Sequence, residues 1–206
     1  MNIAITGEGI VSAIGLNKQE VLQSLQERRS GIGKMKYLQS VHHELPVGEV
    51  NLSNEQMKEK LGIPSKQMMS RTSLLGLLAI DQALKEAHVD VTNLRARKAV
   101  GKPLRIVLVS GTTVGGMDIT ELCFDQLEKQ ESVEFLKHHD CGNCTRLMAD
   151  HFGIFDEVAT LSTACSSAAN AIMLGARLLK AGEADLVVAQ MVRNRTSQPS
   201  GALRRR

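Results

Sequence analysis

The sequence predicts an α/β fold built around a mostly parallel sheet. Short runs rich in Val, Ile and Leu, as in residues 104–111 and 186–189, alternate with segments whose apolar residues follow helical spacing. This alternation is typical of parallel strands covered by helices. A chain of 206 residues is long enough for one sizeable domain of this kind. Aromatic residues make up only 2% of the chain and Trp is absent, so aliphatic side chains and Met must form the core.

The first half of the chain predicts two strands and three helices. We expect a short strand over Asn2–Thr6 and, after a glycine-bounded loop, a helix that begins after Asn17 as N-cap and ends before Gly31. Residues 33–52 are irregular, with a short strand near residues 47–50. A short helix follows within residues 53–63. Residues 65–90 predict a long helix that is apolar on most sides and therefore largely buried.

The second half predicts a repeated alternation of strand and helix. Residues 104–111 form a buried strand that leads into a glycine-rich loop, and residues 117–130 form an amphipathic helix. A short helix follows Asp140, which we expect to be its N-cap. Residues 158–189 then predict a strand, a tight corner, a helix and a final strand.

Composition and charge argue against a membrane protein and against a nucleic-acid partner. No stretch approaches the roughly 18 consecutive apolar residues of a membrane helix, and the N-terminus lacks the pattern of a signal peptide. The formal net charge of +3 comes from five Arg among residues 191–206; without them, 20 basic residues face 22 acidic ones. We therefore expect a cytoplasmic protein with reduced thiols and no nucleic-acid partner.

Cys165 lies at the corner between the predicted strand and the helix that follows. Small residues such as Ser166 and Ala168 fill the first turn of that helix, which lets its backbone approach a neighbouring strand and a substrate. Free N–H groups and the positive end of the helix dipole stabilise an anion there. A thiolate at this position is a favoured nucleophile, and the same N–H groups can stabilise an oxyanion. The alternative is that Cys165 simply packs in the core, as free cysteines often do.

Four segments together resemble the elongating β-ketoacyl-ACP synthases, the condensing enzymes of the thiolase-like superfamily. The most specific of them is STACSSAANAI…GARLLKAGEADLVVA, which resembles the active-site segment of that family. The other three, IAITGEGIVSAIG, MSRTSLLGLLAIDQALKEA and VLVSGTTVGG, resemble its N-terminal strand, its first long helix and the glycine-rich loop beside its acyl pocket. The four occur in the family's order over residues 2 to about 189. The resemblance implies the first half of a thiolase-like, layered α-β-α fold.

The resemblance also implies a reaction and its residues. Cys165 would take an acyl group from acyl carrier protein as a thioester, and malonyl carrier protein would lose CO₂ to give the carbanion that attacks this thioester. Val114 matches the family's acyl-pocket gating residue, and Ala164 borders the same pocket. The partners implied are acyl carrier protein and a second copy in a homodimer. We predict no cofactor and no bound metal.

The same resemblance implies that the family's decarboxylation residues, two histidines and a lysine, have no counterpart here. All six histidines precede Cys165 and match none of the family's motifs. We expect residues 1–190 to form the N-terminal ketosynthase half, and residues 191–206 to be an irregular, Arg-rich tail that resembles a shifted reading frame. On this interpretation the chain is a truncated ketosynthase that does not catalyse condensation.

Two alternatives stay open at the level of sequence. The segment HHDCGNC, residues 138–144, has the C-x-x-C spacing of a zinc ligand pair or a redox pair. A helix that starts at Cys141 explains this pattern more simply. The chain as a whole can also be interpreted as a non-catalytic α/β interaction or scaffold module, in which Cys165 is a packing residue.

Overall fold

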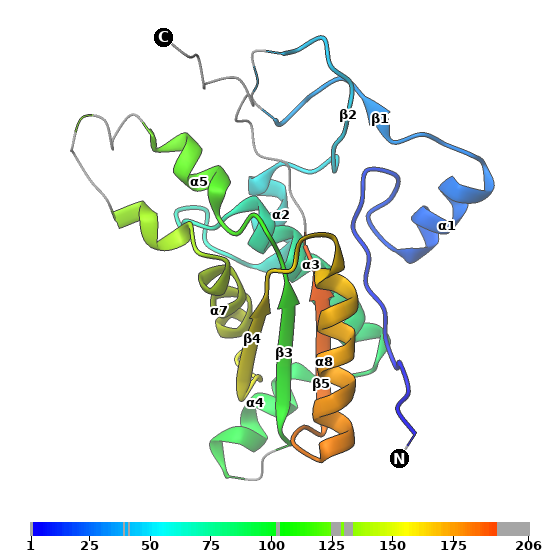
Figure 1. Ribbon diagram of the computed structural model, residues 1–206, viewed down its shortest axis with the longest axis vertical. Helices are drawn as coiled ribbons and strands as arrows, with labels where there is room; N and C mark the ends of the chain where they lie inside the picture. Colours follow the sequence, from blue (N-terminus) through cyan, green and yellow to red (C-terminus); the bar gives the residue numbers. More distant parts are fainter. Residues whose placement is uncertain are drawn as a thin grey trace.

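A three-stranded parallel sheet forms the centre of the protein. The computed structural model describes residues 2–38, 40, 42–101, 104–124, 129 and 134–192. The strands lie in the order β4 (Glu157–Leu161), β3 (Ile106–Gly111) and β5 (Leu186–Met191). Gly111 of the central strand is in register with Leu161 on one side and Met191 on the other. The carboxyl ends of all three strands therefore meet at one edge of the sheet, at the top of Figure 1.

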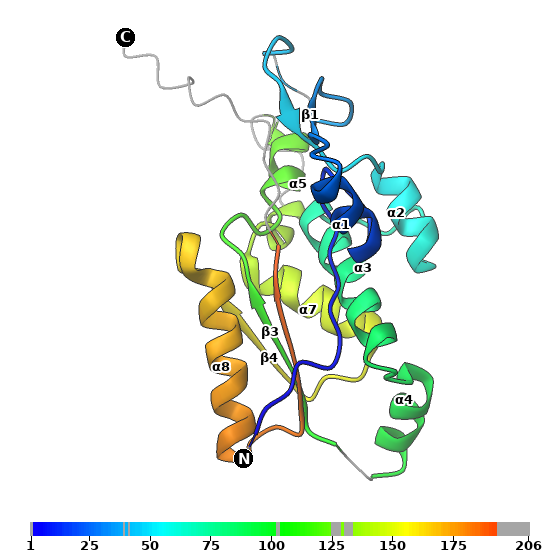
Figure 2. The ribbon, with the colours of Figure 1, turned by 90° about the vertical axis from the view of Figure 1, so that its right-hand side faces the viewer.

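Helices cover both faces of this sheet, as the sequence predicts. Helix α8 (Ser167–Ala181) lies on one face, and α3 (Arg71–Glu86) and α7 (Cys141–Phe152) lie on the other (Figure 2). The central strand β3 is buried along its whole length. Its side chains point alternately to the two faces of the sheet. Ile106 and Leu108 pack in the cluster with α3 and α7, whereas Val107 and Val109 pack in the cluster with α8. The predicted layered α-β-α arrangement is thus confirmed.

The other elements surround this core. They are α1 (Lys18–Gln26), β1 (Ile32–Gly33), β2 (Val47–Gly48), α2 (Asn54–Leu61), α4 (Val91–Ala99), α5 (Met117–Leu122), and the 3-10 turns η1 (Glu134–His138) and η2 (Ala164–Ser166). The predicted caps are correct for α1, where the Asn17 side chain accepts the Glu20 N–H. Asp140 does precede α7, but its side chain makes no capping hydrogen bond. The predicted helix over residues 117–130 is observed as far as Leu122, and residues 125–128 and 130 lie outside the described residues.

Helix α4 was not predicted from the sequence. It has no fully buried residue, and Val91 and Leu94, which pack against the core, stand in a mostly polar run. Its N-cap, Asp90, accepts the Asn93 N–H at 2.9 Å. Arg95 and Lys98 on this helix donate to backbone carbonyls at and just after the end of α7, among them those of Phe152 and Ile154. Cations suit this position because the carboxyl end of a helix carries partial negative charge.

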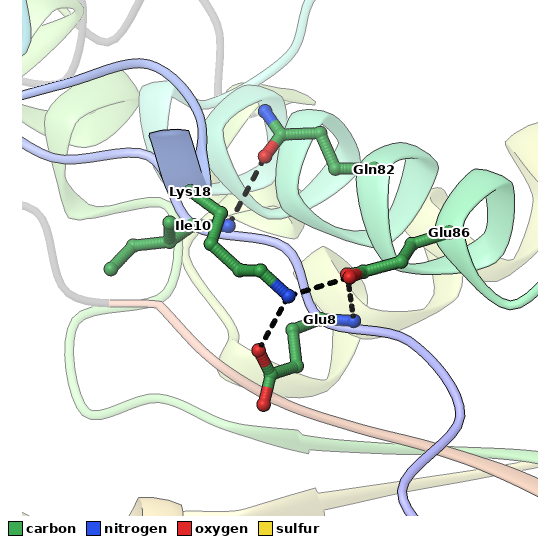
Figure 3. Close-up of polar contacts among 5 residues, drawn as sticks. All are labelled: Glu8, Ile10, Lys18, Gln82 and Glu86. Carbon is green, nitrogen blue, oxygen red and sulfur yellow. Dashed lines mark hydrogen bonds and ion pairs between the residues drawn. The ribbon is translucent and has the colours of Figure 1, made fainter. Parts of the chain in front are cut away.

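The predicted strand at Asn2–Thr6 is wrong. Residues 2–10 have no regular structure, and side chains of α3 accept the backbone N–H groups of two of them, Glu8 and Ile10 (Figure 3). Glu86 Oε2 accepts from Glu8 N at 2.8 Å, and Gln82 Oε1 accepts from Ile10 N at 3.2 Å. Lys18 Nζ forms ion pairs with both carboxylates, at 3.1 Å from Glu8 Oε2 and 2.5 Å from Glu86 Oε1. The segment is therefore held by side-chain acceptors in place of a neighbouring strand.

The folded unit extends slightly into the segment that the sequence assigned to the tail. Strand β5 continues through Met191. Val192 is only 6% exposed, and its N–H donates to the Gly111 carbonyl at 3.0 Å. The irregular region predicted from residue 191 therefore begins after residue 192 at the earliest. The rest of that region, residues 193–206, lies outside the described residues. Among the described helices, none is both long and apolar enough to cross a membrane.

Candidate active site

The carboxyl edge of the sheet brings together the three residues that the sequence singles out. Val114 lies three residues after the end of β3, and Ala164 lies three residues after the end of β4. Because Gly111 and Leu161 are in register, both segments leave the sheet at the same level. The Thr112 N–H donates to the Leu161 carbonyl at 3.0 Å and holds the two segments together there. Cys165 follows directly in the corner between β4 and α8.

Hydroxyl groups hold the corner in shape. Ser167 Oγ accepts the Thr163 N–H at 3.0 Å and donates to the Ala164 carbonyl at 2.9 Å. Ser166 Oγ donates to the Thr163 carbonyl at 2.7 Å. Asn170, one turn along α8, donates to Thr163 Oγ1 at 2.8 Å. This network fixes the backbone on both sides of Cys165 without using the thiol itself.

Ala164 has a backbone conformation that residues with a Cβ rarely adopt. Its φ is +50°, in the left-handed region. Such a conformation costs on the order of 1 kcal/mol or more for a residue other than glycine, so the surrounding structure must enforce it. The hydroxyl network around Ala164 supplies that constraint. The result is a sharp strand-to-helix turn of the kind that presents a nucleophile in other folds.

Cys165 itself is exposed at this turn. The sequence predicts that it begins the helix, but α8 begins two residues later, and Cys165 occupies the short turn η2 that leads into α8. The N-cap of α8, Ser166, makes no side-chain capping hydrogen bond. The Ser166 and Ser167 N–H groups donate to the Thr163 and Ala164 carbonyls, so the positive end of the helix dipole, rather than these two N–H groups, acts on the corner where Cys165 lies.

The start of α8 packs tightly on the end of β3. A Cβ added to Gly111 would lie 2.9 Å from the Ser167 carbonyl oxygen, and Ser167 is itself fully buried. Only small residues allow this approach, which fixes the distance between the corner and the loop after β3. Val114, in that loop, is half-buried. The structure thus places Val114, Ala164 and Cys165 at one edge, although their roles stay predictions.

Three residues of the corner were not selected from the sequence. Thr163, Ser167 and Asn170 provide the network around Cys165, and each contributes a hydrogen bond between a side chain and its neighbours. The signal was present in the segment STACSSAAN, because hydroxyl residues on both sides of a turn commonly bond the local backbone. The small size of these residues alone does not reveal these bonds.

The C-x-x-C segment forms the first turn of α7. Cys144 is buried, and its Sγ lies 3.5 Å from Ser70 Oγ, whereas Cys141 is half-buried. Burial raises the pKa of both thiols, and the nearby Asp140 carboxylate adds to the effect. Within the described parts of the chain, no group of three or more His, Cys, Asp or Glu side chains could hold a metal ion. The predicted zinc alternative therefore has no ligand set there.

Comparison with known proteins matches this chain to a family profile and to curated relatives. The sequence profile described as "Beta-ketoacyl synthase, N-terminal domain" matches residues 1–202. The 3-oxoacyl-[acyl-carrier-protein] synthase 1 of Buchnera aphidicola subsp. Schizaphis graminum is 26% identical over 193 residues. That alignment covers 91% of this chain and 46% of the relative. The chain thus spans about half the length of the curated relatives it matches.

Solved structures agree on the fold. The ishigamide ketosynthase/chain length factor superposes with a TM-score of 0.76 at 19% identity, covering 93% of this chain and 47% of the other. A type II polyketide acyl carrier protein in complex with its ketosynthase, bound to the hexaketide, superposes with a TM-score of 0.71 at 16% identity. That match covers 94% of this chain and 50% of the other. With the profile match over nearly its whole length and with this ketosynthase fold, the chain belongs to the family of beta-ketoacyl synthase N-terminal domains.

Proposed function

We propose that this chain is the acyl-accepting half of a β-ketoacyl-[acyl-carrier-protein] synthase, with Cys165 as the nucleophile. The Cys165 thiolate attacks the carbonyl carbon of an acyl thioester on acyl carrier protein. The tetrahedral intermediate collapses, the carrier thiolate leaves, and the acyl group stays on Cys165 as a new thioester. The observation that carries this proposal is the exposed thiol at a constrained strand-to-helix corner.

The surroundings of Cys165 support this chemistry. The positive end of the α8 dipole stabilises both the attacking thiolate and the negative charge of the intermediate. The hydroxyl network of the corner holds the backbone fixed, so little reorganisation accompanies the attack. Val114 and Ala164 would line the path of the acyl chain, because both lie at the same sheet edge as the nucleophile.

The proposed partner is acyl carrier protein, which delivers the acyl group and, in the full reaction, the malonyl group. One of the similar structures contains an acyl carrier protein with its ketosynthase. The complete reaction would be the decarboxylative condensation of fatty acid or polyketide-type synthesis, carried out by a homodimer. A cytoplasmic location stays a prediction from the sequence.

We expect the 206-residue chain, assayed alone, to accept an acyl group without condensing it. All six histidines precede Cys165 in the sequence, and none occupies a position that matches the family's decarboxylation motifs. Release of CO₂ from malonyl carrier protein by this chain would contradict this expectation. Acyl loading and condensation are measured separately, so this result does not decide the role of Cys165.

Acyl loading of Cys165 tests the proposal directly. The protein is incubated with octanoyl carrier protein, digested with trypsin and analysed by mass spectrometry. Trypsin places Cys123, the pair Cys141 and Cys144, and Cys165 on three separate peptides. We expect the octanoyl mass on the peptide of Cys165, and its removal by hydroxylamine, which cleaves thioesters.

Two variants control this experiment. Cys165→Ser should lose the thioester label, whereas Cys123→Ser, which changes a half-buried cysteine in another part of the protein, should keep it. Equal labelling of all the cysteine peptides, or full labelling of Cys165→Ser, would refute the proposal. That result would favour the scaffold alternative, in which Cys165 has no chemical role.

A further inference from the structure

Cys141 and Cys144 form a second thiol pair that the proposed acyl transfer does not use. They occupy the first turn of α7, three residues apart. In an α-helix, this separation places the two Cα atoms about 5 Å apart. Disulfides join Cα atoms about 4.4–6.8 Å apart, so the helix already holds the pair within bonding range.

The two thiols differ in their access to solvent. Cys141 is half-buried, whereas Cys144 is 1% exposed and its Sγ points to Ser70, the N-cap of α3. A small reagent can therefore reach Cys141 but not Cys144. Cys141 is therefore the attacking thiol and Cys144 the resolving thiol; the raised pKa of Cys141 lowers its thiolate fraction and makes the attack slow.

The first residue of the pair, Cys141, lies against the glycine-rich loop that contains Val114. A Cβ added to Gly115 would lie 2.9 Å from the backbone nitrogen of Cys141, so the two backbones touch. The Gly116 N–H donates to the His139 carbonyl at 3.2 Å. His139 Nδ1 also lies 2.9 Å from Thr120 Oγ1 in α5, which follows the loop. Any movement of the backbone at Cys141 on disulfide formation would therefore reach this loop.

We propose that Cys141 and Cys144 form a reversible disulfide, which makes the start of α7 an oxidation-sensitive site coupled to the Val114 loop. The oxidant is a small disulfide such as glutathione disulfide. The oxidation itself does not depend on the acyl transfer proposed above. Only its consequence for acyl binding rests on the proposed role of Val114.

The reaction proceeds in two balanced exchanges. The Cys141 thiolate attacks one sulfur of glutathione disulfide, forms a mixed disulfide and releases one glutathione thiolate. The Cys144 thiolate then attacks the Cys141 sulfur, closes the protein disulfide and releases the second glutathione. Two protein thiols are oxidised, one glutathione disulfide is reduced to two thiols, and the two thiol protons pass to solvent and the leaving glutathiones.

Tryptic mapping tests the proposal on the intact chain. Trypsin releases residues 138–146 as one peptide that contains both cysteines. The folded, reduced protein is incubated with glutathione disulfide, quenched with acid, blocked with N-ethylmaleimide and digested. We expect this peptide to lose the mass of two hydrogen atoms and to take up no maleimide. Treatment with dithiothreitol should restore both thiols.

The Cys144→Ser variant identifies the order of the two steps. Without the resolving thiol, the mixed disulfide at Cys141 should persist, and the peptide should carry one glutathione. Cys123→Ser, which leaves the pair intact, should behave as the wild type. A stable glutathione adduct on the wild-type peptide, or two unreacted thiols while Cys165 is oxidised, would overturn the proposal.

Hydrogen exchange tests the coupling to the loop. In the oxidised wild type, amides of residues 112–116 should exchange at least several-fold faster than in the reduced protein, because the Gly116 hydrogen bond is strained. The amides of β3, which is buried along its whole length, provide the internal reference. Unchanged exchange in the loop of a fully oxidised sample would refute the coupling, whatever the acyl-loading result.

Discussion

Strand β3 and the N-terminal segment contain similar short aliphatic runs, but the first run forms a buried strand and the second forms none. The run IVLVS in β3 is paired on both sides, and each of its residues is buried. The run NIAIT near the N-terminus forms no strand, and Ile3 and Ile5 are 38% and 81% exposed. Composition alone therefore does not make a strand. A run of this length needs neighbouring strands and helices that cover its side chains.

Different forces hold the two regions. Apolar contacts on both faces stabilise β3, with Leu108 and Val109 each fully buried. The N-terminal segment is held to α3 by hydrogen bonds from its backbone to Gln82 and Glu86 and by the ion pairs of Lys18. The first region should therefore depend on volume and shape, and the second on charge and close backbone approach.

The largest expected effect comes from a cavity in the central strand. Leu108→Ala should lower the free energy of unfolding by about 3 kcal/mol, because it removes a fully buried side chain between β3 and the helices on one face. Ile5→Ala, the matched change in the N-terminal segment, should alter it by less than about 0.5 kcal/mol. Urea unfolding followed by circular dichroism measures both. Equal losses for the two variants would show that Ile5 is buried in solution.

An intermediate effect should follow from a methyl group at Gly9. A Cβ there would lie 1.9 Å from the Ala79 carbonyl oxygen of α3, which is too close for any side chain. Gly9→Ala should therefore displace the segment from α3 and cost about 1–2 kcal/mol, in the lower part of the range of about 1–3 kcal/mol for an overpacked contact. Amide exchange at Glu8 and Ile10 should accelerate while β3 stays protected. Unchanged protection at both amides would show that the segment does not dock as described.

The smallest effect concerns the charge of Glu86. The Lys18 side chain and then the Glu8 N–H stabilise its carboxylate and lower its pKa below the ordinary value of 4.5. A group whose pKa falls on folding contributes stability above its unfolded pKa, and this contribution is lost as the pH drops through the folded pKa. Protection of the Glu8 amide, corrected for intrinsic exchange, should therefore be constant above pH 4.5 and decrease below it.

Glu86→Gln should reduce this pH dependence. Glu183→Gln, which changes an exposed carboxylate in the turn after α8, is the control and should keep it. Because Glu86 and Lys18 are exposed to solvent, we expect a local change in exchange and no measurable shift in the urea midpoint. A pH profile in Glu86→Gln identical to that of the control would assign the effect to another group.

The sequence predicted the central layers well because their signals are local. A continuous apolar run predicts the buried strand β3, apolar residues on most sides predict the buried helix α3, and Gly182 predicts the end of α8. The N-terminal strand was wrong because strand formation depends on a neighbour that is distant in sequence. Helix α4 was missed because its partly buried Val91 and Leu94 stand in a mostly polar run, and the bond of Arg95 to the end of α7 leaves no apolar pattern.

The place of Cys165 at the corner between β4 and α8 was predicted, but the bonds that support this corner were not. Cys165 is identifiable from its place between a strand and a small-residue helix. The left-handed Ala164 and the bonds of Ser167 to both Thr163 and Ala164 could not be predicted, because they depend on backbone geometry at a turn. The shared edge of Val114 and Ala164 needed the register of β3 and β4, which only the structure supplies.

The most direct test of the account compares the alkylation rate of Cys165 in the folded and unfolded chain. We expect the corner to activate this thiol and not merely to expose it. With iodoacetamide at neutral pH, Cys165 should react before Cys123 in the folded protein, and several-fold faster than in the same chain unfolded in urea. A folded rate equal to or below the unfolded rate would contradict the claim and leave Cys165 as an ordinary surface thiol.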